Sequence, residues 1–246
     1  MRGSACVSET VVIEERFHGP PRSANGGYTC GVLARLLDAD GAVEATLRAP
    51  PPLGHSLGVV RSGDAVELRD GEALVAEARP TDDPEIDLPA AISIEQATEA
   101  RRDAPTEDHP FPTCFVCGPA RAPGDGLNVV CGPVPGRERE LIGSVFDSAA
   151  WSADRGGAVP PEIVWGVLDC PSGIAGTVVP VEGLYVLGRL TARIERPLKT
   201  GPSYAVIGWP ITEEGRKFDG GSAILDADGD PLAWARSTWI RIKETA

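Results

Sequence analysis

The stretch that decides the fold runs from Val159 to Ala175 and reads VPPEIVWGVLDCPSGIA. Its apolar residues recur at helical spacing, and the proline pair at its start suits the first turn of a helix, where the missing N–H is not needed. Asp169 lies among the apolar residues of this predicted helix. Because an unpaired buried charge is costly, its carboxylate is predicted either to lie at a solvated helix edge or to have a specific role.

A second helix is predicted in the first half of the chain, from Ala24 to Leu37, with Ser23 as its N-cap. Glycines lower the helix propensity of this segment, so we expect them to allow a ligand to approach the backbone closely. Each predicted helix follows one strand and precedes four. The predicted strands are 7–17, 42–49, 55–61, 65–69 and 73–79, and then 140–146, 184–196, 204–211, 222–226 and 232–242.

This repeated order predicts an internal duplication of about 100 residues. We expect an N-terminal unit at 1–80 and a C-terminal unit at 128–246, joined by an acidic linker rich in Pro and Gly at 81–127. The linker could contain a short helix at 94–102. Each unit would pack one helix on an antiparallel meander, and the two units could join their sheet edges. The predicted fold class is α+β, with two helices packed on one side of a continuous antiparallel sheet.

Composition restricts the class of protein further. The 246 residues are 42% hydrophobic and 24% charged, and no apolar run is long enough to predict a membrane span. The net charge of −13 argues against a nucleic-acid partner, which needs a basic surface for phosphate. The polar N-terminus does not resemble a secretory signal, so a cytoplasmic protein is expected. Six unevenly spaced cysteines do not predict a disulfide framework.

Three stretches resemble double hot-dog proteins of the acyl-CoA thioesterase type: residues 23–28 (SANGGY), 161–175 and 190–197 (LTARIERP). The His-Gly-Gly-Val segment that opens the helix in hot-dog thioesterases is similar to Asn25-Gly26-Gly27-Tyr28. In the branch of phenylacetyl-CoA and 4-hydroxybenzoyl-CoA thioesterases, an acid follows that histidine by nine residues. The second half keeps the acid as Asp169 but has proline at position 160, whereas the first half keeps the glycines but has alanine at position 34.

The resemblance therefore implies one composite site, with Asp169 from the second unit facing Asn25, Gly26 and Gly27 from the first. The carboxylate would activate water or attack the thioester, and N–H groups at the helix N-terminus would stabilise the oxyanion. The predicted function is acyl-CoA thioesterase, with coenzyme A as part of the substrate and no cofactor required. The alternative is a non-catalytic hot-dog protein that binds acyl-CoA or lipid.

Basic residues after the second predicted helix could contact the phosphates of coenzyme A. The candidates are Arg193, Arg196 and Lys199, although charges on late strands commonly form a solvated face. The resemblance also implies association beyond one chain, and a homodimer is expected. Light scattering that detects only a 25.8 kDa species at micromolar concentration would contradict this expectation.

No catalytic metal is predicted, but the linker contains Cys114 and Cys117 in a CxxC turn that could hold a structural zinc ion. His109 and Cys131 are possible further ligands. Reduced cysteines that pack a turn, or a disulfide, remain alternatives, since a four-ligand zinc site normally shows a second pair. Cys170 is not expected to be a nucleophile, because no histidine lies nearby in the sequence to activate it.

Overall fold

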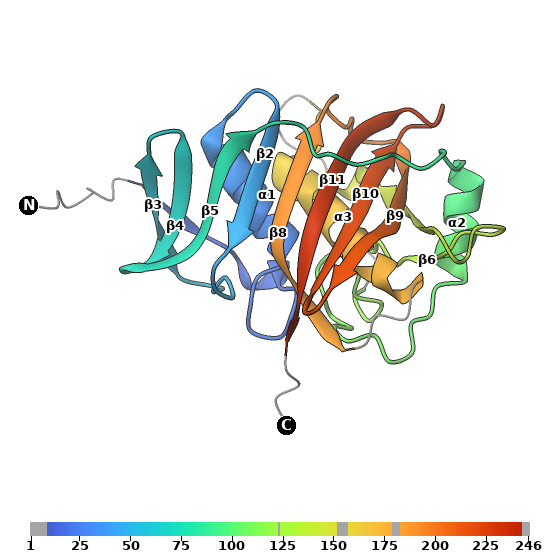
Figure 1. The fold of residues 1–246 in the computed structure, drawn as a ribbon, viewed down its shortest axis with the longest axis horizontal. Helices are drawn as coiled ribbons and strands as arrows, with labels where there is room; N and C mark the ends of the chain where they lie inside the picture. Colours follow the sequence, from blue (N-terminus) through green and yellow to red (C-terminus); the bar gives the residue numbers. More distant parts are fainter. Residues whose placement is uncertain (1–8, 123, 152–156, 179–182, 243–246) are drawn as a thin grey trace, which may run out of the picture.

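The computed structural model describes residues 9–122, 124–151, 157–178 and 183–242, and of residues 150 and 151 only the backbone. Its described strands form one sheet of eleven, in the order β1-β3-β4-β5-β2-β8-β11-β10-β9-β7-β6 (Figure 1). The strands are β1 (Glu9–Val12), β2 (Ala42–Leu47), β3 (Ser56–Ser62), β4 (Ala65–Asp70), β5 (Ala73–Thr81), β6 (Gly132–Pro133), β7 (Ile142–Asp147), β8 (Leu184–Ile194), β9 (Ser203–Glu214), β10 (Lys217–Leu225) and β11 (Pro231–Ile242).

The continuous antiparallel sheet predicted from the sequence is confirmed. Strands β1 to β5 form one half and β6 to β11 the other, and every pairing between neighbours is antiparallel. The halves meet where β2 pairs with β8 over four residue pairs, from Val43 opposite Ala192 to Thr46 opposite Arg189. The pairing of β2 with β8 therefore joins the two halves into a single hydrogen-bonded sheet.

Three α-helices of the described residues lie around this sheet, one more than the fold class predicted: α1 (Gly26–Leu37), α2 (Ile94–Arg102) and α3 (Pro161–Ile174). Helix α2 forms in the linker because Ser93 and Gln96 make a capping box. Its buried face, Ala97 and Ala100, packs on the C-terminal half of the sheet. None of the described helices is both long and apolar enough to cross a membrane.

The sheet is covered on both faces, and β9 shows how its residues alternate between them. Tyr204 and Val206 belong to the main core beneath α1 and α3, whereas Ala205 and Ile207 belong to a smaller core with α2. In Figure 1, α1 and α3 lie side by side on one face, and the linker crosses the opposite face toward α2. Side chains that project from α1 and α3 therefore meet in the main core.

Two glycines let α1 and α3 pack closely. A Cβ atom on Gly27 would lie 2.3 Å from the Asp169 Cβ atom and 2.6 Å from the Trp165 carbonyl oxygen. A Cβ atom on Gly31 would lie 2.4 Å from the Glu162 Cα atom. The expectation that both glycines open the backbone to a ligand is corrected here, because a second helix occupies the space beside them.

The first strand is shorter than predicted. The sequence pattern predicted a strand over 7–17, but β1 ends at Val12 and Glu15–Phe17 forms a 3-10 helix. This turn brings Phe17 onto the start of α1, where its carbonyl oxygen accepts a hydrogen bond from the Asn25 N–H at 2.8 Å. Residues 7 and 8 of the predicted strand lie outside the described part.

Candidate active site

Asp169 projects from the buried side of α3 toward the N-terminus of α1. Its Oδ2 atom accepts a hydrogen bond from the Gly27 main-chain N–H at 2.8 Å and another from the Asn25 side-chain amide at 3.0 Å. The first N–H groups of a helix have no partner within the helix and carry positive partial charge, which suits a carboxylate. The structure thus brings Asp169 into contact with two residues that lie more than 140 positions earlier in the sequence.

Asn25 is fixed at both ends of its side-chain amide. Asn25, and not Ser23 as predicted, is the N-cap of α1. It accepts a hydrogen bond from the Tyr28 N–H at 2.8 Å through Oδ1, and it donates to Asp169 through Nδ2. These two bonds define which end of the amide faces the carboxylate. Its capping role and its contact with Asp169 therefore occur together.

The second carboxylate oxygen of Asp169 is different. Oδ1 is buried and has no hydrogen-bond partner among the described residues, and the residue is only 2% exposed. Burial raises the pKa of Asp169 to about 7, although the Gly27 N–H and the Asn25 amide oppose this rise. A carboxyl group with a pKa in this range can exchange a proton near neutral pH.

The N–H groups of Gly26 and Gly27, both expected at the site, differ in their hydrogen bonding. The Gly27 N–H is already bonded to Asp169, whereas the Gly26 N–H has no hydrogen bond to any described residue. Gly26 lies against Leu47 and Leu187, since a Cβ atom placed on it would approach the Leu187 side chain to 2.9 Å. Gly26 therefore lies in an apolar environment between β2 and β8.

The position on α1 that corresponds to Asp169 on α3 has no acid. Ala34 stands on α1 nine residues after its N-cap, as Asp169 does on α3, and Pro160 caps α3 without a side-chain hydrogen bond. Nearby, Glu162 pairs with Arg35 at 3.4 Å. The described residues thus show a carboxylate bonded to a facing helix N-terminus at one of the two related positions, as the divergence of the halves predicted.

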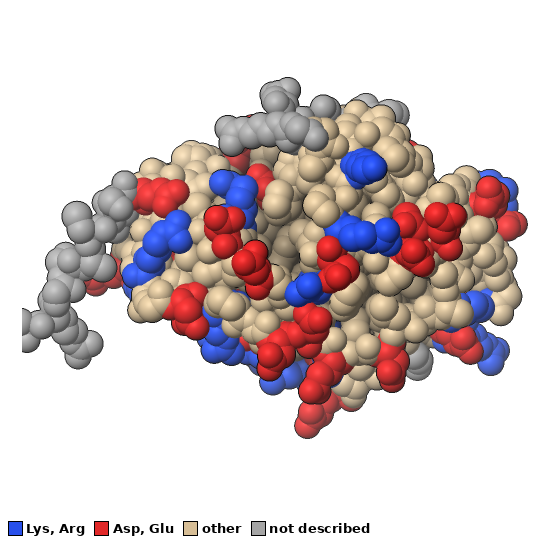
Figure 2. All heavy atoms as spheres, turned by 90° about the horizontal axis from the view of Figure 1, so that it is seen from above, with Lys and Arg blue, Asp and Glu red and all other residues tan. Residues whose placement is uncertain are grey.

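The basic residues proposed for coenzyme A lie at the far end of β8 or beyond it. Arg193 is six residues from Leu187, which corresponds to about 20 Å along a strand. Two of the three candidates pair with carboxylates: Arg193 with Glu195 at 2.7 Å, and Arg196 with Asp226 at 3.3 Å. On the face drawn in Figure 2, basic side chains are interspersed with acidic ones and do not form a continuous basic patch.

The CxxC turn of the linker lies beside Asp169. The sulfur atoms of Cys114 and Cys170 are 3.8 Å apart, and the Asn25 Nδ2 atom lies 3.8 Å from each of them. Phe115 of the same turn packs edge-on against Phe17 and Tyr28, which stack on each other. The sequence did not indicate that the turn and α3 meet, because no spacing rule relates positions 114 and 170.

The turn is held in place by Arg121, whose side chain is only 5% exposed. Its guanidinium donates to the carbonyl oxygens of Thr113 at 2.8 Å and Arg16 at 2.7 Å, and pairs with Asp125 at 3.0 Å. It also lies over the Phe115 ring. One side chain therefore connects the turn to the segment that precedes α1.

We expect Arg121→Met to destabilise the protein by about 2 to 4 kcal/mol, because it leaves two carbonyl oxygens without a charged donor. The midpoint of urea unfolding measures this loss. Arg102→Met is the control, since Arg102 is exposed on α2 and should change the midpoint little. Equal midpoints for the two variants would contradict the anchoring role.

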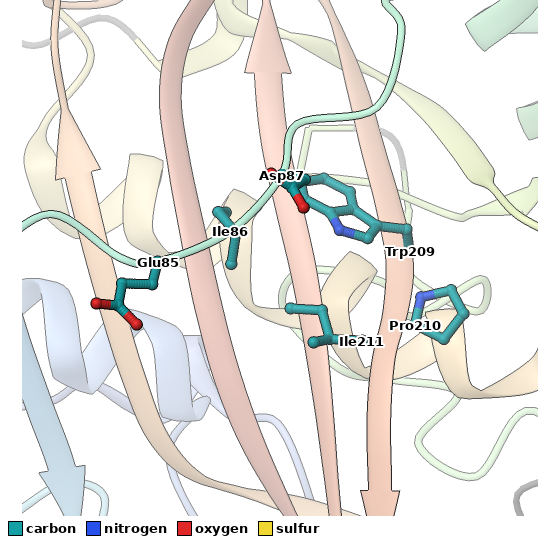
Figure 3. Close-up of a pocket in the computed structure, with 6 residues that line it drawn as sticks. All are labelled: Glu85, Ile86, Asp87, Trp209, Pro210 and Ile211. Carbon is teal, nitrogen blue, oxygen red and sulfur yellow. The ribbon is translucent and has the colours of Figure 1, made fainter.

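A separate pocket lies on the opposite face of the sheet. It has a volume of about 540 Å³ and is lined by linker residues Glu85, Ile86 and Asp87 and by Trp209, Pro210 and Ile211 of β9 (Figure 3). The sheet separates this pocket from Asp169, because Trp209 belongs to the smaller core and Asp169 projects from α3 in the main core. The pocket and the carboxylate therefore do not form one site.

Comparison with known proteins identifies the fold. A candidate thioesterase from Novosphingobium aromaticivorans aligns with a TM-score of 0.61 at 11% identity, over 95% of each chain. A candidate thioesterase II from Thermobifida fusca aligns with a TM-score of 0.59 at 17% identity, over 96% of each chain. A protein with a hot-dog fold from Alicyclobacillus acidocaldarius aligns at 0.53 and 12% identity, over 96% of this chain and 93% of that one.

The chain therefore has a hot-dog fold. No protein-family model matches the sequence, and no curated protein matches it either. Since the identities are between 11% and 17%, these alignments establish the fold, and the chemistry has to be argued from the site itself.

Proposed function

We propose that the protein is an acyl-CoA thioesterase in which Asp169 activates the attacking water. The observation that carries this proposal is the free Oδ1 atom of a buried carboxylate whose other oxygen is bonded to the N-terminus of the facing helix. A buried polar atom without a partner needs an explanation, and a catalytic role is one of the few available. The structural neighbours described as thioesterases support the same reaction class.

The proposed reaction converts a thioester and water into a carboxylic acid and free coenzyme A. Oδ1 of Asp169 takes a proton from water while the water oxygen forms a bond to the thioester carbonyl carbon. The carbonyl oxygen becomes an oxyanion, for which the unpaired Gly26 N–H is the proposed donor. The carbon–sulfur bond then breaks, and the leaving thiolate takes the proton back from Asp169.

The two hydrogen bonds to Oδ2 leave Oδ1 available for the proposed reaction. Gly27 and Asn25 fix the carboxylate plane from one side, so Oδ1 keeps a constant direction without a hydrogen bond of its own. Fixing the base before substrate arrives removes an entropic cost from the chemical step. Asn25 is thus proposed as a positioning residue and Gly26 as the oxyanion donor.

Hydrolysis of a panel of acyl-CoAs, differing in chain length and in aromatic content, tests the proposal. Loss of thioester absorbance, or chromatography of released coenzyme A, is the suitable readout because it does not depend on thiol reagents. Turnover above the buffer rate that disappears in Asp169→Asn supports the proposal. Equal turnover in the two proteins would contradict it.

A non-catalytic acyl-CoA-binding protein is the second candidate. The observation that favours it is closure of the site: Asp169 is 2% exposed, and the N–H of Gly27 is already occupied. Calorimetric binding of coenzyme A or acyl-CoA without turnover of any panel member would establish this alternative. It would leave the fold assignment unchanged and remove the proposed role of Oδ1.

Under the same proposal, Lys199 contacts a phosphate of coenzyme A. It is exposed and, within the described residues, makes no ion pair, unlike Arg193 and Arg196. Lys199→Ala should raise KM about two- to fivefold at low salt with little change in kcat, and added salt should shrink the difference. Arg102→Met on the distant helix α2 is the control, and an unchanged KM in Lys199→Ala would contradict the contact.

A further inference from the structure

The cluster of three cysteines beside the proposed active site suggests a second function for this region. The thiols of Cys114, Cys117 and Cys170 are buried, and their sulfur atoms all lie within 4.8 Å of one another. Two belong to the CxxC turn of the linker, and the third belongs to α3. We propose that these three thiolates bind one Zn²⁺ ion, which fastens the linker to the central helix.

The measured spacing fits such an ion. In a tetrahedral site with Zn–S bonds of about 2.3 Å, two sulfur atoms lie about 3.8 Å apart. The sulfur atoms of Cys114 and Cys170 are 3.8 Å apart, which is far longer than a disulfide bond of about 2.0 Å. The backbone thus already holds these ligands near the separation that zinc requires.

The hydrogen-bond donors around the cluster also suit thiolates. The Asn25 amide nitrogen lies 3.8 Å from both the Cys114 and the Cys170 sulfur, and such second-shell donors stabilise metal-bound sulfur. A bound cation would balance the negative charge of three buried thiolates.

The two further ligands suggested by the sequence do not join the cluster. The Cys131 thiol donates to the Val129 carbonyl oxygen at 3.7 Å, and His109 Nδ1 accepts a hydrogen bond from the Phe111 N–H at 3.1 Å. Among the described residues, no fourth Cys, His, Asp or Glu lies within the same distance of all three sulfur atoms. The fourth position on the ion is therefore assigned to water or another small ligand, as in zinc sites that keep an open position.

Soft thiolate ligands narrow the choice of metal. Three sulfur ligands disfavour Mg²⁺ and Ca²⁺, which prefer oxygen, and suit Zn²⁺. The ion would connect two segments that are 56 positions apart in the sequence. The proposal does not depend on thioesterase activity, and its tests use metal content, spectra and mass.

The first experiment measures metal in the full-length protein. After removal of metal with a chelator under reducing conditions, the protein is titrated with Zn²⁺ and, separately, with Co²⁺. We expect one equivalent of either ion, a near-ultraviolet thiolate-to-cobalt absorption band and an upward shift of the thermal midpoint. Binding of less than about a tenth of an equivalent of both ions would overturn the proposal.

Variants then assign the ligands. Cys170→Ser should weaken zinc binding by more than about 100-fold, since loss of a ligand should exceed the 10- to 100-fold cost of losing a second-shell partner. Cys131→Ser is the matched control, because Cys131 is also buried and lies in the same part of the chain but outside the cluster. Equal zinc affinity in the two variants would overturn the assignment.

A measurement on the unmodified protein covers the case in which Cys170→Ser fails to fold. Protein purified without added reductant is denatured and its intact mass compared before and after reduction. A gain of two hydrogens, with a crosslinked peptide that joins Cys114 to Cys117 or Cys170, would show a disulfide and overturn the zinc proposal. An unchanged mass together with one bound zinc ion supports it.

Discussion

Asp169→Asn is expected to lower the turnover of acyl-CoA by a factor of about 10² to 10⁴, the usual worth of a general base. The amide oxygen of asparagine can still accept the hydrogen bonds from Gly27 and Asn25, so the helix contact should survive. The amide cannot take a proton from water, so the chemical step should be lost. Initial rates at saturating substrate, with unfolding midpoints for both proteins, separate loss of catalysis from loss of structure.

Glu162→Gln is the matched control for this experiment. Glu162 also lies on α3 and also has a buried carboxylate oxygen without a partner among the described residues, but it pairs with Arg35 and does not meet the turn at Gly27. Its turnover should stay within about twofold of the unmodified protein. A comparable loss in both variants would mean that Asp169 acts through stability, and full activity in Asp169→Asn would end the catalytic proposal.

Gly27→Ala is expected to destabilise the protein by about 3 kcal/mol or more. The added methyl group would lie 2.3 Å from the Asp169 Cβ atom and 2.6 Å from the Trp165 carbonyl oxygen, neither of which can move without separating α1 from α3. The gain in helix propensity from alanine, about 1 kcal/mol, is too small to offset this clash. Urea unfolding monitored by circular dichroism gives the difference.

A second glycine provides the comparison. Gly166 lies inside α3, and a Cβ atom there would meet the side chains of Val116 and Leu127 at 3.3 and 3.6 Å. Because one methyl group has to move by only a few tenths of an ångström, Gly166→Ala should change stability by no more than about 1 kcal/mol. If Gly27→Ala were as stable as Gly166→Ala, the close packing of the two helices would not be essential.

The sequence predicted helices and strands well where the spacing of apolar residues agreed with the proline and glycine residues that end each segment. The predicted helix from Pro161 and the strands β2 to β5 lie where expected, because proline pairs and short Gly-Asp turns mark their ends. Strand β10 was predicted to begin at Ser222 but begins at Lys217. The pair Gly220 and Gly221 concealed its first half, since glycine is unfavourable in a strand unless another group approaches closely.

The reason for those glycines is tertiary. A Cβ atom on Gly220 would lie 2.0 Å from the Ser172 carbonyl oxygen, and one on Gly221 would lie 2.2 Å from the Trp209 ring. Contacts of this kind depend on which elements pack together, and sequence spacing does not report them. The same limitation explains the misassigned role of Gly27, whose neighbour is α3 itself.

The candidate site was predictable in part. The resemblance pointed to Asp169 opposite Asn25 and Gly27, and the structure places these three residues in hydrogen-bond contact. The contact between Cys170 and Cys114 was missed, because the only local signal was a cysteine without a nearby histidine. Cys114 lies in the acidic linker, yet the residue is only 2% exposed.

The four residue pairs between β2 and β8 have a consequence for biosynthesis. When the ribosome has completed β5, strand β2 has an unpaired edge, and the glycine face of α1 has no helix against it. The 113 residues from Asp82 to Ile194 must still be added before β8 can pair, which takes about 6 to 23 seconds at ordinary rates of translation. During that interval the nascent first half presents an open strand to other nascent chains.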